Sequence, residues 1–186
     1  MGEKIVKSIT GLVAGAAAKT AQKYDTKHQH IFHVVCKDVN GNIKWEDDIF
    51  NLVTNEGLDE ILDQFYSGSA YTAAHYLGLT DGTPSFAEAD TMSSHAGWAE
   101  VTAYDEAVRQ TLTWAASSGQ SKTSDADVFT IDTNSTTIGG AFITTVSTKG
   151  GTTGTLIGGG AFSAGDKTLD DNDTLTVTVF ATAAAA

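Results

Sequence analysis

The sequence predicts a mainly β protein: an antiparallel β-sandwich, jelly-roll-like, with an N-terminal helical arm and one short helix. Three observations lead to this prediction. Roughly eight or nine short segments alternate apolar and polar residues, as half-buried strands do. Residues typical of turns, such as Gly, Asn, Asp and Ser, cluster between these segments. Two stretches have apolar residues at helical spacing instead.

Length and composition indicate one domain with short appendages. A chain of 186 residues accommodates one ordinary domain and leaves little room for a second. We expect residues 1–28 to form the arm and residues 29–182 to form the sandwich body. The low-complexity end, residues 183–186, is expected to be frayed.

The expected arm has an amphipathic pattern. Ile5, Ile9, Leu12 and Val13 recur at helical spacing, with lysine and threonine at other positions. Glycines weaken this helix, so packing against another surface has to supply most of its stability. That surface belongs to the body, to a sister subunit or to another protein. The segment also imitates a secretory signal peptide, although its apolar stretch is weak for that role.

A hairpin is predicted to open the body. Residues 30–38 and 43–50 alternate as two strands, and Asn40-Gly41 supplies the positive φ angles that a tight turn requires. The single cysteine, Cys36, is expected to be a small buried apolar side chain of this hairpin and not a catalytic thiol. A lone thiol also fits folding in a reducing cytosol.

A short helix is predicted next, from Thr54 or Asn55 to about Tyr66, because either of the first two residues can cap it. We expect its apolar stripe to belong to the core: Leu58, Ile61, Leu62 and Phe65.

The remaining strands are predicted from their alternation and from the turns between them. Long polar or glycine-containing loops are expected at residues 81–97, 117–127 and 149–154. In the last strand Leu175, Val177 and Val179 should face the core. The strands are expected at residues 71–79, 98–104, 109–117, 128–132, 138–148, 156–160 and 173–182.

The charge distribution disfavours two classes of partner. The net charge is −12, yet residues 1–30 carry five lysines against two acidic residues, which leaves six basic and 21 acidic residues for the remainder. An acidic body repels nucleic acid and anionic membranes, because binding either requires a basic footprint. No apolar run of about 20 residues exists, so no transmembrane helix is expected.

The sequence contains only incomplete versions of the motifs typical of phosphate-binding, metal-binding and catalytic sites. The glycine-rich stretch 150–160 lacks the Gly-Lys-Ser/Thr ending of a phosphate loop. His28, His30 and His33 could present imidazoles on one strand, but no further metal ligands are specified. Residues 170–173 lack the spacing of a calcium loop, and no nucleophile elbow is present. We therefore predict no catalytic residue, no cofactor and no metal.

Several motifs occur together in a recognisable order. They are Asn-Leu-Val-Thr-Asn-Glu-Gly at residues 51–57, His-Tyr-Leu-Gly-Leu at 75–79, Ala-Asp-Thr-Met at 89–92 and His-Ala-Gly-Trp at 95–98, followed by the stretch 141–156. With them the chain resembles a family of small virion proteins of tailed bacteriophages, over about residues 33–182. Glu88-Ala89 departs from that pattern, where a glycine is common, and should alter loop geometry alone.

The resemblance implies a structural role in a virion assembled in the bacterial cytoplasm. We expect a capsid decoration (cement) protein that binds the major capsid protein, as a dimer or trimer, without enzymatic activity. Its anchoring residues are expected in the arm and in the hairpin Ile31–Phe50: Ile5, Ile9, Leu12, Val13 and Trp45.

Three alternatives remain open at this point. One is a tail, fibre or head–tail accessory component with the same fold. Another is a carbohydrate-binding module that stacks sugars on Trp45, Trp98 or Trp114. The last is an enzyme.

Overall fold

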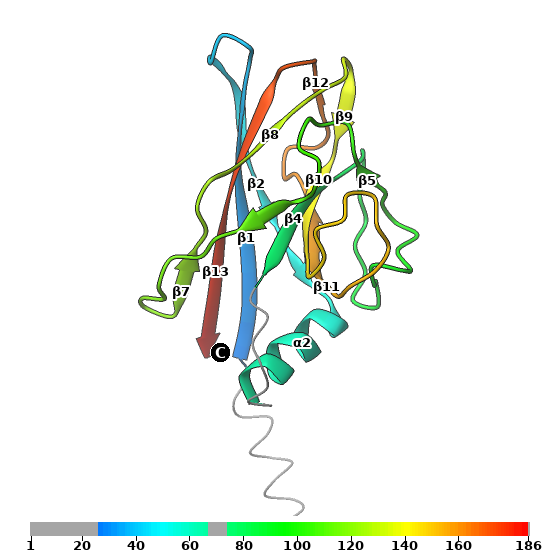
Figure 1. The fold of residues 1–186 in the computed structure, drawn as a ribbon. Helices are drawn as coiled ribbons and strands as arrows, with labels where there is room; N and C mark the ends of the chain where they lie inside the picture. Colours follow the sequence, from blue (N-terminus) through cyan, green and yellow to red (C-terminus); the bar gives the residue numbers. More distant parts are fainter. Residues whose placement is uncertain (1–25, 67–73, 186) are drawn as a thin grey trace, which may run out of the picture.

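A computed structural model describes residues 26–66 and 74–185 of the chain and shows a mainly β protein with antiparallel sheets (Figure 1). Within these two ranges a single helix accompanies the strands. The elements are β1 (Thr26–Lys37), β2 (Ile43–Phe50), β3 (Leu52–Val53), α2 (Asn55–Tyr66), β4 (His75–Thr80), β5 (Glu100–Val101), β6 (Gln110–Leu112), β7 (Ser121–Thr123), β8 (Asp127–Thr130), β9 (Thr136–Ile138), β10 (Gly140–Thr144), β11 (Leu156–Ala161), β12 (Lys167–Leu169) and β13 (Thr174–Ala185).

The first sheet is built on the first and last strands of the described chain. Its order is β2-β1-β13-β7, and β8 also pairs with β13. Strand β1 pairs with β13 along twelve residues, from Thr26 opposite Ala185 to Lys37 opposite Thr174. The predicted hairpin is confirmed, since β1 pairs with β2 across the turn at Gly41, whose φ is +84°.

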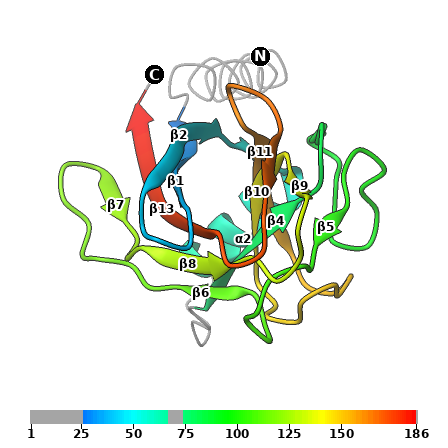
Figure 2. The ribbon, with the colours of Figure 1, turned by 90° about the horizontal axis from the view of Figure 1, so that it is seen from above.

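The second sheet has the order β3-β11-β10-β4-β5, and β6 also pairs with β4. Strands β9 and β12 form a separate two-stranded sheet. Seen from above, β1, β2 and β13 stand opposite β4, β10 and β11 (Figure 2).

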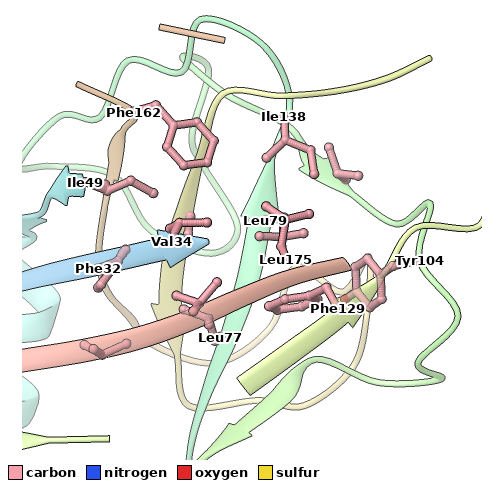
Figure 3. Close-up of a cluster of buried hydrophobic side chains, with 14 of the residues drawn as sticks. Phe32, Val34, Ile49, Leu77, Leu79, Tyr104, Phe129, Ile138, Phe162 and Leu175 are labelled. Atoms are coloured by element: carbon pink, nitrogen blue, oxygen red, sulfur yellow. The ribbon is translucent and has the colours of Figure 1, made fainter. Parts of the chain in front are cut away.

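The main core lies between the two larger sheets (Figure 3). Inward-facing residues of both sheets meet there, because alternate side chains of each strand point the same way. The predicted inward face of β13 is confirmed: Leu175, Val177 and Val179 are fully buried. Cys36 is buried as expected, and burial raises the pKa of its thiol to about 11.

Backbone contacts join the two sheets at both edges. On one side the chain passes from β2 through Asn51 into β3, and Ile49 forms a bridge with Phe162. On the other side Trp114, just after β6, forms a bridge with Ser124, just after β7. These links fix the position of the two sheets relative to each other around the core.

The outer face of the second sheet carries a smaller aromatic cluster. Phe142 of β10 lies flat over Gly78, and Trp98 packs 4.9 Å from Phe142 between ring centroids. A Cβ atom at Gly78 or Gly159 would overlap the ring of Phe142 or Phe86. The strand glycines therefore make room for these rings, and both faces of the second sheet are buried.

Helix α2 begins and ends as predicted. The Thr54 hydroxyl accepts a hydrogen bond from the Gly57 amide, which is the expected cap. The same hydroxyl donates to the Leu156 carbonyl, and the Glu56 carboxylate accepts from the Leu156 amide. The first turn of the helix is thereby fastened to β11.

The prediction that the whole apolar stripe of α2 is core was wrong. Leu58 is 39% exposed and Leu62 is 52% exposed, whereas Ile61 is half-buried. The reason is that α2 docks through Gly57, whose missing side chain lets the helix backbone approach Ile157. That orientation turns the two leucines away from the sheets.

Several strand boundaries also differ from the predictions. The loop expected at 117–127 contains β7, and the stretch 138–148 divides at Gly139, where a Cβ atom would overlap the Asp81 carbonyl. Strand β12 was missed. In residues 98–104 the strand β5 covers two residues.

The C-terminal strand is more regular than expected as far as it is described. Ala183, Ala184 and Ala185 pair with His28, Lys27 and Thr26. Strand β1 thus provides a partner for the end of the chain as far as Ala185, and the frayed end expected at residues 183–186 stays a prediction. The arm residues Ile5, Ile9, Leu12 and Val13 lie outside the described residues.

Candidate functional site

Three large apolar side chains lie side by side on the outer face of the first sheet. We call them the outer row: the exposed Phe50 and Phe180 with the half-buried Ile31 between them. Ile31 of β1 pairs with Phe50 of β2 on one side and with Phe180 of β13 on the other. Directly opposed residues of antiparallel strands project to the same face. Phe50 is 58% exposed and Phe180 is 40% exposed, so three adjacent strands present one apolar strip.

Polar groups border the outer row. At the next outward-facing position His33 of β1 pairs with Asp48 of β2, and Nδ1 of the histidine lies 2.9 Å from the carboxylate. Beyond them Val35 is opposite Glu46. An apolar strip with a charged border on a paired sheet is typical of a protein–protein contact surface.

A cavity of about 160 Å³ lies where the two sheets end above α2. Its lining is mainly apolar, with imidazoles and an ammonium group among the apolar side chains. The lining residues are His30, Ile61, His75, Trp114, Lys122, Ile143, Ile157 and Ala181.

The alternation of β1 and β13 explains this cavity. Phe32 and Val179 are opposed at the buried end of the core, and the next inward pair is His30 with Ala181. A small alanine opposite an imidazole fills less space than a pair of large apolar residues. The core therefore stops there, and the cavity begins.

Burial disfavours the protonated form of both histidines that line the cavity. Burial, followed by the neighbouring His75 and His28, lowers the pKa of His30 to about 4. The pKa of His75 is also lowered, chiefly by burial. Nδ2 of Asn51 lies 2.7 Å from Nδ1 of His30, so the amide donates to an unprotonated ring nitrogen.

The acidic runs of the sequence fold into ion pairs that fasten loops. Nζ of Lys44 lies 2.5 Å from Asp173, at the entrance to β13. Nζ of Lys167 lies 3.1 Å from Asp47, which also accepts a hydrogen bond from the Ser163 hydroxyl. Each of these two carboxylates is paired with a lysine that fixes a loop, so neither is poised for acid–base chemistry in a cleft.

The buried ion pair between Arg109 and Glu100 also fastens a loop. Arg109 is fully buried and contacts Glu100 at 2.7 and 2.9 Å. Its guanidinium also donates to the carbonyls of Val146 and Gly151. This network holds the loop between β10 and β11 against β5.

The three tryptophans are differently placed. Trp98 is 6% exposed, and its ring is stacked against His95 and Phe86. Trp45 is half-buried and packs edge-on against Phe162 at 5.4 Å, and Trp114 lines the cavity. The face of Trp98 is therefore occupied by protein rings, which counts against sugar stacking there.

The sequence did not single out Phe50, Phe180, Leu58 or Leu62 as surface residues. Alternation does place Phe50 and Phe180 opposite to the core-facing Ile49 and Val179. Which two strands flank β1, however, depends on pairing with β13, at the far end of the chain. His28, His30 and His33 are divided by the same alternation, since His33 faces outward and His30 inward.

Within residues 26–66 and 74–185 no cluster of three or more histidine, cysteine or acidic side chains is arranged to hold a metal ion. Among the described helices none has the length and apolar character needed to cross a bilayer. No family model matches the chain, and neither a curated protein nor a solved structure matches it.

Proposed function

We propose that this protein is a non-enzymatic structural component of a bacteriophage virion, and that it decorates the capsid by binding the major capsid protein. The proposal starts from the ordered motifs between residues 51 and 156 that resemble virion proteins of tailed phages. In it, the two facing sheets form a jelly-roll-like sandwich. The protein acts as a dimer or trimer and joins the particle in the bacterial cytoplasm.

The observation that carries the proposal is the outer row. It crosses three hydrogen-bonded strands, and Phe50 and Phe180 remain 58% and 40% exposed. Burying such side chains at a contact contributes about 1.5–3 kcal/mol each when the burial is complete. Many copies on a shell would add the retention that avidity gives to modest contacts.

The arm contributes a second contact in this proposal, through Ile5, Ile9, Leu12 and Val13. Residues 1–25 join the body at Thr26, on the same strand as Ile31 of the outer row. Trp45, on β2, stays a predicted anchoring residue, although its half-buried ring supports Phe162.

The test is occupancy on purified particles. The Phe50→Ser/Phe180→Ser variant should bind shells at least about tenfold more weakly, because it removes the apolar strip and keeps the core. Removal of residues 2–24 should weaken binding as well. Occupancy is measured by densitometry of particles separated on a gradient, with electron cryo-microscopy to place the density.

Val108→Ser is the matched control, since Val108 is 49% exposed in a loop between β5 and β6. Its occupancy should equal that of the wild type. Unchanged occupancy of both the double variant and the truncated chain would refute capsid binding through these surfaces. Density on the tail instead of the shell would show that the protein is a tail component.

A further inference from the structure

The exposed face of α2 combines leucine with aspartate. Leu58, Asp59, Leu62 and Asp63 are the exposed side chains of its middle turns. The helix carries four acidic residues and no basic residue between Asn55 and Tyr66. Its opposite side, at Gly57 and Ile61, is the side that meets β11 and the cavity. The exposed face of α2 therefore carries both apolar and negatively charged side chains.

The chain before β1 joins the body beside this helix. His30 of β1 and Ile61 of α2 line the same cavity, and Thr26 begins the strand that holds His30. Figure 1 shows the beginning of β1 and the helix α2 at the same end of the molecule. Residues 1–25 are thus tethered next to α2.

Residues 1–25 are complementary to the exposed face of α2 in their apolar pattern and in their charge. Their apolar residues recur at helical spacing, and they carry four lysines against two acidic residues up to position 25. An apolar stripe can cover the two leucines while ammonium groups lie near the aspartates. The lysines concerned are Lys4, Lys7, Lys19 and Lys23.

We propose that, in the free protein, residues 4–23 dock along the exposed face of α2 of their own chain. Tethering favours the chain's own segment over that of a second copy, because a short linker gives an effective concentration in the millimolar range. Residues 24 and 25 are that linker, and they join the docked segment to Thr26 at the end of the body where α2 lies. The inference concerns the isolated protein and does not depend on a virion role.

The test is the rate at which a lysine-specific protease cleaves the segment under native conditions. The variant Leu58→Ser/Leu62→Ser should be cleaved at Lys7, Lys19 and Lys23 about tenfold faster than the wild type, since the apolar contact is lost. Asp59→Lys should give a smaller increase, and added salt should reduce its difference from the wild type. All these substitutions are at exposed positions, so circular dichroism should show an unchanged fold.

Val128→Ser is the matched control, because Val128 is 41% exposed on β8, away from α2. It should leave cleavage unchanged. Equal cleavage of the leucine variant and the wild type would overturn the proposal. Light scattering that shows a wild-type oligomer and a monomeric leucine variant would also overturn it, in favour of docking on a second copy.

Discussion

At the scale of single residues, the burial of the Arg109 charge depends on its partners. Arg109 has no exposed surface, yet Glu100 and two backbone carbonyls satisfy its guanidinium. The ring of Phe142 lies 5.2 Å from the guanidinium carbon. Replacing the pair by apolar residues could be neutral, but removing one partner leaves an uncompensated charge in the interior.

Glu100→Gln should therefore lower the free energy of unfolding by about 3–5 kcal/mol. The amide keeps the shape of the carboxylate and removes the charge that balances Arg109. Urea denaturation followed by circular dichroism measures the change. Glu88→Gln, the same substitution at an exposed position, should alter the stability by less than about 0.5 kcal/mol. Equal stabilities of the two variants would show that Arg109 is solvated on loss of its partner.

At the scale of elements, close approach of backbones decides where α2 lies. The Thr54 cap and the Glu56 carboxylate bind the Leu156 backbone, and Gly57 permits contact with Ile157. Propensity alone would favour alanine at position 57, because glycine costs a helix about 1 kcal/mol relative to alanine. Tertiary contact reverses that preference.

Gly57→Ala should consequently destabilise the protein by about 1–3 kcal/mol, although alanine is the better helix former. The added methyl group overlaps the Ile157 carbonyl, and the obstacle is backbone that cannot rotate away. Denaturant midpoints compared with those of Asp59→Ala, at an exposed helix position, separate the clash from propensity. A gain in stability for Gly57→Ala would mean that the helix does not sit against β11.

At the scale of the whole molecule, the stability should depend on pH through groups at the ends of the sheets. His30 has its pKa lowered to about 4, so the native state resists its protonation. Its contribution is fully present above pH 6.5 and is lost as the pH falls from 6.5 towards 4. Asp127 acts in the opposite direction, because burial, followed by the nearby Asp125, raises its pKa to about 6.

We expect His30→Gln to flatten the decline in stability between pH 6.5 and about pH 4. The wild-type histidine accounts for a loss of about 3 kcal/mol over that range, which the variant should not show. Asp127→Asn should steepen the decline, since it removes the group that takes up a proton on the native side. Urea denaturation at about pH 7, 5.5 and 4.5 gives both slopes, and three parallel curves would contradict the assignment.

Local patterns in the sequence determined the mainly β class, the hairpin at Gly41, the cap at Thr54 and the inward face of β13. These features depend on neighbours within a few residues, since alternation, turn chemistry and capping are local. The sequence patterns did not predict the short strands β7 and β12, because these strands are polar and are held by pairing with β13 and β9.

The pairing of β1 with β13, the exposure of Leu58 and Leu62, the outer row and the cavity were decided by the tertiary structure alone. Each depends on residues far apart in the chain: Ile31 lies between Phe50 and Phe180, and Gly57 lies against Ile157. Alternation indicates which side chains share a face of one strand. Only the packing of the sheets decides which strands become neighbours and which faces remain in contact with water.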